Sequence, residues 1–193
     1  MRLFVLARHG ESELNLTGRV NGDPAVPVAL SELGRAQARS LGEQTAAIHW
    51  DVCVVTRFGR THETEAIALA GRDVPVVTEP LLDDIDVGDL EGQTLTEYRT
   101  WKHAHDRSDA FPGGESLDDA GRRYARAFRG LLASRHERVL VVCHEIPVRY
   151  AINAATGSDD LDAPVHDVLN AVPHLFDVPG LERAAAGIER LVG

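Results

Sequence analysis

The chain has 193 residues, and 20 Lys and Arg against 30 Asp and Glu give it a formal net charge of −10. This length suits a single domain with a buried core. A composition that is 44% hydrophobic and 26% charged is typical of a globular protein and excludes a disordered one. The negative charge argues against a nucleic-acid partner or a polybasic membrane-binding patch, because both need clustered positive charge.

The cysteines and the apolar runs indicate the cellular setting. Cys53 and Cys143, the only cysteines, are far apart and each lies in an apolar run, which predicts buried thiols in a reducing compartment. No apolar run approaches the roughly 18–20 residues that span a bilayer. The apolar stretch at residues 3–7 is too short for the core of a signal peptide. We therefore expect a cytoplasmic protein with no membrane partner.

Short apolar runs alternate with amphipathic segments along the chain. The runs at residues 3–7, 52–55, 74–78, 139–143 and 172–178 are predicted strands. A first helix is predicted after the N-cap Ser31, with a periodic stripe at Leu33, Ala36, Gln37, Leu41 and Gln44. Further helices are predicted at residues 61–69 and 117–132. On the last of these we expect a solvated face that carries Arg122, Arg123, Arg126 and Arg129.

The alternation predicts an α/β fold in one domain over residues 1–193, with a mostly parallel sheet covered by helices on both faces, a three-layer α/β/α sandwich. In such a sheet, functional groups gather where the strands end. Residues 10–30 and 88–116 look irregular, and loops of that length in a compact domain are usually functional.

Two predicted strands end in histidine. His9 follows the first strand within Arg8-His9-Gly10, and His144 follows the fourth. The carboxyl ends of parallel strands lie at one edge of a sheet, so the two histidines are candidates for one site. Arg8 beside His9, with Gly10 permitting close backbone approach, is the pattern expected of an anion site that contains a nucleophile.

Residues 8–12 together with Asn15 resemble the signature of the histidine phosphatase superfamily, in its phosphoglycerate mutase-like branch 1. Further blocks that resemble the family follow in the family's order, at residues 19–23, 30–38, 56–64, 82–92, 111–116 and 139–144, and from Asn170 onward. A short signature alone is weak, whereas an ordered set from Arg8 to about Val178 is specific.

The resemblance implies a phosphoglycerate mutase-like fold and phosphoryl transfer through a phosphohistidine, with no cofactor and no metal. It also implies roles for individual residues: catalytic His9, Asp84 and His144; phosphate-binding Arg8, Asn15, Arg60 and His144; and substrate-binding backbone at Asn21 and Gly22.

Physical chemistry explains why such a site needs these residue types. A phosphomonoester is a dianion near neutral pH, and the guanidinium groups of Arg8 and Arg60 match its oxygens in geometry and charge. A nucleophilic imidazole must be neutral, and neighbouring guanidinium groups lower the pKa of His9. A carboxyl group beside arginines is normally ionised, so we expect the bound dianion to favour the protonated form of Asp84, which then protonates the leaving oxygen.

The sequence also departs from the family pattern. Many members have Glu where this chain has Asp84, and Asp83 and Asp86 are neighbouring alternatives for the proton donor. Glu145 follows the second histidine, where the family usually has Gly. A carboxylate there would weaken phosphate binding unless it points away or pairs with Arg149. Arg57 stands where the family usually has a small or cyclic residue, as a surface charge or a contact at the rim.

The reaction type and the substrate-facing surface depend on the segment after residue 92. Mutases of the family have a longer insertion here and an Asn two residues after the second histidine, where this chain has Ile146, so the resemblance favours hydrolysis. We expect residues from about 93 to 115 to form a small helical cap. Its candidate substrate contacts are Tyr98, Trp101, His103, His105 and Arg107, and the alternative is a solvated helix with one aromatic face packed inward.

The sequence thus predicts a phosphomonoester hydrolase that acts on a small phosphorylated metabolite. The alternatives are a mutase-type phosphotransferase and a phospholigand-binding module without turnover. His103, His105 and Asp106 have no second ligand pair at suitable spacing, so no metal site is predicted.

Overall fold

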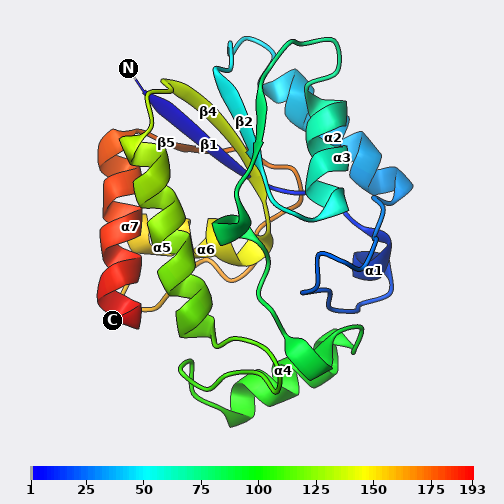
Figure 1. Cartoon of the computed structure of the whole chain (residues 1–193), viewed down its shortest axis with the longest axis vertical. Helices are drawn as coiled ribbons and strands as arrows, with labels where there is room; N and C mark the ends of the chain where they lie inside the picture. Colours follow the sequence, from blue (N-terminus) through cyan, green and yellow to red (C-terminus); the bar gives the residue numbers. More distant parts are fainter. Residues whose placement is uncertain (1) are drawn as a thin grey trace.

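A computed structural model describes residues 2–193 as an α/β fold built on one five-stranded sheet (Figure 1). The sheet has the order β3-β2-β4-β1-β5, and its strands are β1 (Leu3–Arg8), β2 (Val52–Val55), β3 (Val76–Thr78), β4 (Arg138–Cys143) and β5 (His174–Phe176). The four strands from β3 to β1 are parallel, and β5 pairs antiparallel with β1 at one edge. The predicted mostly parallel sheet is confirmed.

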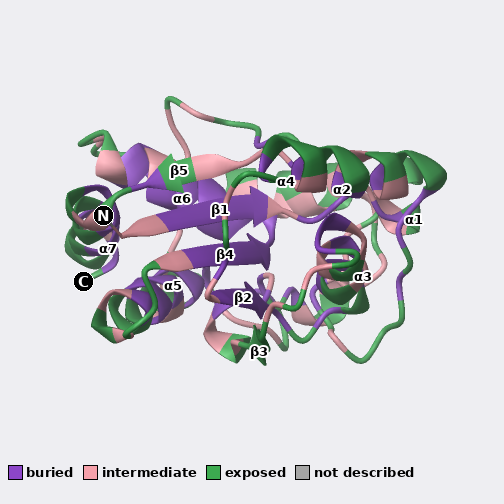
Figure 2. Cartoon of the chain, turned by 90° about the horizontal axis from the view of Figure 1, so that it is seen from above, coloured by how far each residue is buried: buried purple, intermediate pink, exposed green. Residues whose placement is uncertain are grey.

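Helices cover both faces of the sheet, which confirms the predicted three-layer sandwich (Figure 2). One face carries α5 (Leu117–Ala133), α6 (Glu145–Ala155) and α7 (Val178–Val192), and the other carries α2 (Glu32–Gln44) and α3 (Gly59–Ala68). The short α1 (Glu13–Leu16) and α4 (Leu95–Ala104) lie apart from these layers (Figure 1). Two 3₁₀ turns, Pro80–Leu82 and Gly88–Leu90, lie between β3 and α4. No helix within residues 2–193 is both long enough and apolar enough to cross a bilayer.

Alternation along the strands divides the core into two parts. Phe4 and Leu6 of β1 pack in one buried cluster with Tyr124 of α5, whereas Val5 packs in another with Leu140 of β4. Successive side chains of a strand point to opposite faces, and here both faces are covered. For this reason the central strands are apolar throughout. Packing on both faces holds these strands, and therefore their ends, in place.

The first long helix, α2, presents a different face to the core from the one expected. Its buried residues are Gly34, Ala38 and Leu41, whereas Leu33 is 55% exposed. Leu41 of the predicted stripe is buried, but Leu33 is not, because Gly34 lies directly against the backbone of Glu11, where a side chain would overlap the carbonyl oxygen. This close backbone approach determines how the helix is rotated.

The C-terminal part of the chain differs from the strand predicted at residues 172–178. The strand β5 covers only His174–Phe176, and Asp177 then caps α7 by accepting a hydrogen bond from the Gly180 N–H (2.7 Å). A helix was not predicted here, although an Asp N-cap followed by Pro179 is a recognisable start signal. The sequence prediction of buried free thiols at Cys53 and Cys143 is confirmed.

Candidate active site

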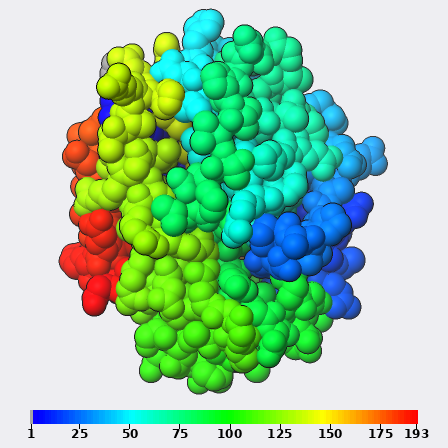
Figure 3. Space-filling model, in the orientation of Figure 1, coloured from blue at the N-terminus to red at the C-terminus, as the bar shows by residue number. Residues whose placement is uncertain are grey.

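The site lies where three adjacent parallel strands end. His9 follows β1, Thr56 follows β2 and His144 follows β4, and the register of these strands brings their carboxyl ends together. A cavity of about 380 Å³ opens between these ends, the loop after α1 and the inner side of α4. At this end of the molecule the loop after α1 lies beside the start of α4, and an antiparallel backbone bridge joins Arg19 to Thr94 (Figure 3).

His9 is buried, and both its ring nitrogens have defined partners. Nδ1 lies 2.6 Å from the carbonyl oxygen of Gly10, and Nε2 accepts a hydrogen bond from Nε of Arg60 (3.0 Å). A carbonyl only accepts and a guanidinium only donates, so the proton is on Nδ1 and the lone pair is on Nε2. Burial, and then the charges of Arg60 and Arg8, hold the pKa of His9 well below its usual value. His9 is therefore a neutral imidazole whose Nε2 lone pair is held by the hydrogen bond from Arg60.

Gly10 fixes the chain after His9 in a way that the sequence did not indicate. A Cβ atom here would overlap the carbonyl oxygen of Gly34 in α2, and the Gly10 N–H donates to Oγ1 of Thr64 in α3 (3.0 Å). The glycine therefore allows close packing of α2. It anchors His9 between the two helices of this face.

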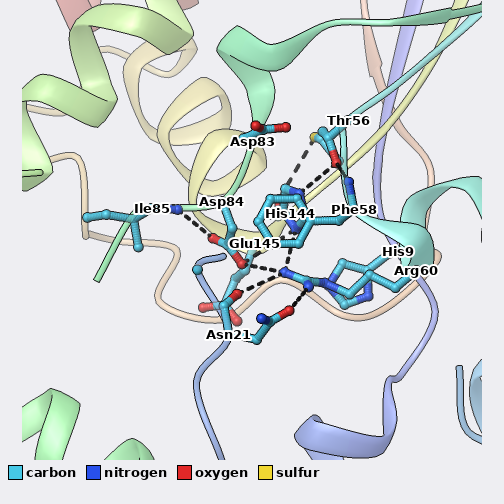
Figure 4. A network of polar contacts seen from close by, with 12 residues as sticks. His9, Asn21, Thr56, Phe58, Arg60, Asp83, Asp84, Ile85, His144 and Glu145 are labelled. Atoms are coloured by element: carbon cyan, nitrogen blue, oxygen red, sulfur yellow. Dashed lines mark hydrogen bonds and ion pairs between the residues drawn. The ribbon is translucent and has the colours of Figure 1, made fainter. Parts of the chain in front are cut away.

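Arg60, in the first turn of α3, is the centre of the polar network (Figure 4). Besides His9, it donates to Oδ2 of Asp84 (3.0 Å), to Nδ1 of His144 (3.1 Å), and to both the side-chain and main-chain oxygens of Asn21. Its guanidinium stacks over the Phe58 ring at 4.2 Å. These contacts fix a planar fork of donors in the cavity, which suits a tetrahedral oxyanion.

His144 is buried at the N-cap of α6 and is held by Thr56, a partner that the sequence analysis did not identify. Its Nε2 lies 2.9 Å from Oγ1 of Thr56, and its Nδ1 accepts from Arg60. Burial and the charge of Arg60 lower its pKa well below the usual value, so the ring is neutral with its proton on Nε2. In this state Nδ1 presents a lone pair 3.4 Å from Oδ2 of Asp84.

Among the three neighbouring aspartates, only Asp84 lines the cavity. Asp83 turns away and binds the main-chain N–H (2.9 Å) and guanidinium of Arg57, which settles the role of that arginine as its partner (Figure 4). Asp86 is exposed and accepts from the Gly88 N–H (3.0 Å). Burial raises the pKa of Asp84, against the opposing effects of Arg60 and Arg8. Burial thus brings the pKa of Asp84 closer to the range in which an anion that binds beside it can cause its protonation.

Arg123 of α5 holds the backbone on which Asp84 stands. It donates to the carbonyl oxygens of Leu81 (3.1 Å), Asp83 (2.7 Å) and Asp84 (2.8 Å), and its Nε lies 3.0 Å from Oε2 of Glu115. Its side chain is only 13% exposed. The prediction that Arg123 lies on a solvated helix face is therefore wrong, because the residue at the edge of the apolar stripe turns inward to bind the loop.

Arg8 enters the cavity from the end of β1 and meets Glu145. Its Nη1 lies 2.7 Å from Oε2 of Glu145 and donates to the carbonyl oxygen of Val168 (2.9 Å). Glu145 also pairs with Arg149, one helical turn further along α6, at 2.7 Å. The expected pairing with Arg149 is thus present, but the carboxylate does not point away from the site.

Helix α1 and the loop after it line another wall of the cavity, through Asn15 of the helix and Asn21 and Gly22 of the loop. Asn15 accepts from the Ser12 N–H through Oδ1 (3.0 Å), as part of the capping box of α1. The N–H of Gly22 and the side-chain amide of Asn21 both donate to Glu91, at 2.6 Å and 2.7 Å. Glu91 therefore already binds the backbone N–H of Gly22 that was expected to face a substrate, and it was not identified as a site residue from the sequence.

Residues 4–174 match the family model of the histidine phosphatase superfamily (branch 1). The chain belongs to the histidine phosphatase superfamily. It is 32% identical to a 2,3-bisphosphoglycerate-dependent phosphoglycerate mutase of Methylobacterium sp. (strain 4-46), over 91% of this chain and 90% of that protein. It is also 32% identical to phosphoserine phosphatase 1 of Hydrogenobacter thermophilus, over 81% of this chain and 77% of that protein.

The fold comparison agrees. The structure superposes on the alpha-ribazole phosphatase from Shigella flexneri with a TM-score of 0.79, over 91% of this chain and 90% of that one. At 24% identity, this likeness shows the fold alone. The relatives in sequence include both a mutase and a phosphatase, so the family is established and the type of reaction is left to the site.

The cap was expected either to contact the substrate or to pack an aromatic face inward. In this histidine phosphatase superfamily member, different residues of the cap fit each expectation. Tyr98 and His103 line the cavity as expected. Trp101, by contrast, stacks between Phe111 and His105, with ring centroids 4.1 Å from each. A cationic pair, Arg99 and Lys102, lines the cavity beside Tyr98, and the sequence analysis did not select it.

Arg107 is also turned away from the cavity, because it pairs with Asp118 (3.2 Å) and Asp162 (2.6 Å) and donates to the hydroxyl of Tyr150 (3.0 Å). Within residues 2–193, no group of three or more His, Cys, Asp or Glu side chains is placed to hold a metal ion.

Proposed function

We propose that this protein is a phosphomonoester hydrolase that acts through a phosphohistidine on His9. The observation that carries the proposal is the state of His9, a neutral ring with the Nε2 lone pair in a cavity lined by Arg8 and Arg60. A neutral imidazole is a nucleophile, and two guanidinium groups attract the phosphoryl group to it. A carboxyl group with a raised pKa stands in the same cavity at Asp84.

In the first step, Nε2 of His9 attacks phosphorus and the bond from phosphorus to the leaving oxygen breaks. Arg60, which donates to Nε2, transfers its hydrogen bond to the phosphoryl oxygens. Asp84 gives its proton to the leaving oxygen and becomes a carboxylate. The carbonyl of Gly10 accepts from Nδ1 and stabilises the positive charge that forms on the ring.

In the second step, water attacks the phosphorus of phospho-His9. The carboxylate of Asp84 takes one proton from this water, and the bond between phosphorus and Nε2 breaks. Inorganic phosphate leaves, and both His9 and the protonated Asp84 are regenerated. Two displacements at phosphorus thus replace a single difficult one.

Two features support hydrolysis of a small metabolite over transfer to a second hydroxyl. Ile146 lines the cavity where mutases of the family have an Asn, and its side chain has no hydrogen-bonding group to orient an acceptor. The cavity, about 380 Å³, is at the small end of ligand sites. The similarity to a phosphoglycerate mutase supports transfer as the second candidate.

The deciding experiment measures phosphate release in EDTA from a panel of small phosphomonoesters, with wild type, His9→Ala and His136→Ala side by side. His136 is exposed and is not among the residues that line the cavity, so it serves as the histidine control. We expect turnover by wild type and by His136→Ala and none by His9→Ala. Turnover by His9→Ala would refute the nucleophile. Transfer to an added sugar or glycerate hydroxyl without phosphate release would favour the mutase. Binding without either reaction would favour a phospholigand-binding module.

A further inference from the structure

Glu145 places a carboxylate inside a pocket that must bind a dianion. It is the first residue of α6, directly after His144, and its side chain lines the cavity near Asp84 (Figure 4). With 28% of its side chain exposed, it lies 2.7 Å from Arg8 and 2.7 Å from Arg149. The two steps proposed above make no use of it. A negative charge at this point opposes phosphate binding, so its presence needs a physical account.

Arg149 does not require the charge of Glu145. Its Nη2 lies 2.7 Å from Oδ1 of Asp162, and its Nη1 also donates to the carbonyl oxygen of His166 (2.9 Å). Arg149 therefore has a second carboxylate partner, although Asp162 also pairs with Arg107 (2.6 Å). Arg8, by contrast, pairs with Glu145 and with no other carboxylate of residues 2–193, so Glu145 is the carboxylate that acts on Arg8.

Arg8 influences Asp84 as well as the phosphoryl group. Its positive charge is one of the effects that lower the pKa of Asp84 and keep the carboxyl ionised. A carboxylate in contact with Arg8 offsets that charge at Asp84. Glu145 thus acts on the proton donor through Arg8, without touching it.

The same carboxylate changes what the site requires of an incoming dianion. Arg8 and Arg60 supply two positive charges, which would match a dianion if Asp84 were ionised and no other anion were present. With Glu145 in place, the ionised form of Asp84 adds a further repulsion. Protonation of Asp84 removes this repulsion.

We infer that Glu145 is a positioning residue that couples binding of the phosphoryl dianion to uptake of a proton by Asp84. The dianion then binds together with the proton that Asp84 must later deliver to the leaving group. This inference rests on the proposed function, since it assigns Glu145 a part in loading the general acid.

Other charged and titratable groups around Asp84 and Glu145 do not replace this effect. They come from every neighbouring element: Arg8 and His9 after β1, Arg60 in α3, Tyr98 and Lys102 in α4, Arg123 in α5, His144 and Arg149 in α6, and Asp162, His166 and Asp167 after α6. His9 and His144 are held neutral, and Asp162 is engaged by Arg107 and Arg149. Glu145 is the carboxylate in direct contact with Arg8.

The test counts protons taken up when an anion binds. Sulfate is the probe, because it is a dianion throughout the neutral range and takes up no proton itself. Calorimetric titration in two buffers of different ionisation enthalpy gives the number of protons bound per sulfate. We expect about one proton for wild type, and clearly less for Glu145→Gln, which keeps the size and the hydrogen-bond acceptor but removes the charge. Asp167→Asn, a cavity carboxylate for which no contact with Arg8 is found in residues 2–193, is expected to behave as wild type.

Kinetics supply an independent readout. For Glu145→Gln we expect a Ki for inorganic phosphate that is about tenfold lower, and an alkaline limb of the kcat profile about one pH unit lower, since one pKa unit corresponds to a factor of ten. Asp167→Asn is expected to change neither by more than about twofold. Unchanged proton uptake, or weaker phosphate binding, in a folded Glu145→Gln protein would show that Glu145 merely holds Arg8 in place, and would overturn the inference.

Failure of the proposed function is distinguishable from failure of this inference. The sulfate titration on wild type requires no turnover and no variant, and it is repeated with His9→Ala to remove the nucleophile. Absence of proton uptake by wild type would overturn the coupling even if phosphate release occurs normally.

Discussion

Replacing Arg123 by glutamine is expected to damage both stability and catalysis, although Arg123 lies outside the cavity. The guanidinium donates hydrogen bonds to three carbonyl oxygens of the loop, those of Leu81, Asp83 and Asp84. It also pairs with Glu115. Glutamine retains one donor group and loses the charge. The loop then loses most of its attachment to α5, and Glu115 loses its partner.

The magnitude follows from burial. Removing one partner of a buried ion pair costs about 3–5 kcal/mol, because the other charge is left without compensation. Water can partly replace Arg123 at Glu115, whose side chain is 21% exposed. We therefore expect the free energy of unfolding to fall by about 2–4 kcal/mol. Displacement of a catalytic group by about 1 Å can cost about 100-fold in rate, so kcat should fall by about 10- to 100-fold.

The assay compares Arg123→Gln with Arg122→Gln, the adjacent arginine of the same helix. Arg122 is exposed and, within residues 2–193, pairs only with Asp119, so its replacement should cost at most about 0.5 kcal/mol. Urea unfolding gives the stability, and kcat is measured at a temperature where both variants are folded. If the two variants agree within about 0.5 kcal/mol in stability and about twofold in kcat, the assignment of Arg123 as the support of Asp84 is refuted.

Three further predictions concern the chemistry of the cavity. Asp84→Asn should lower kcat/KM, which reports on the first step, by about 10²–10⁴-fold for alkyl phosphates but far less for p-nitrophenyl phosphate, whose leaving group needs no proton; equal losses of kcat/KM for both would exclude Asp84 as the acid. The profile of kcat/KM against pH should rise as His9 loses its proton, below the usual pKa of histidine, and fall as Asp84 loses its own, above the usual pKa of aspartate, so the optimum is acidic. An optimum in the alkaline range would contradict this assignment. Lys102 lies 3.8 Å from its nearest carboxylate and so leaves positive charge for a substrate. Lys102→Met should raise the KM for 3-phosphoglycerate about tenfold and leave the KM for glycerol 3-phosphate unchanged. Equal effects on both would exclude a contact between Lys102 and the carboxylate of 3-phosphoglycerate.

The parts of the site that follow strand ends could be predicted from the sequence. A histidine after an apolar run identifies both the strand and the edge at which it ends, and this placed His9 and His144 together. Residue patterns do not contain long-range polar contacts. Arg123 lies next to the buried Tyr124 at the edge of an amphipathic stripe, and periodicity does not decide whether such a long side chain turns to solvent or inward. Glu145 at the start of α6 contacts Arg8 at the end of β1, and this side-chain contact is seen only in the folded structure.

The rotation of α2 illustrates a similar limit. The sequence pattern identified the helix but placed Leu33 on its buried side, together with Leu41. Leu33 is exposed because the contact of Gly34 determines how this end of the helix packs. Close packing of two backbones leaves no hydrophobic signal in the sequence. The helix α7 was predictable from its cap and its apolar stripe, and was missed because the preceding strand prediction was extended too far.

The position of β1 in the sheet has a consequence for how the chain acquires its structure. This strand is inserted between β4 and β5, and its paired residues lie more than 130 positions later in the sequence, as in Leu3 with Arg138 and Phe4 with Phe176. During synthesis, the apolar side chains of β1 stay unpaired until most of the chain has left the ribosome. Folding through such distant pairings is slow, and the apolar strand is exposed to aggregation until the pairings form. The first apolar residues of the chain are therefore a natural point of attachment for chaperones, and His9 has no catalytic environment until this late pairing is complete.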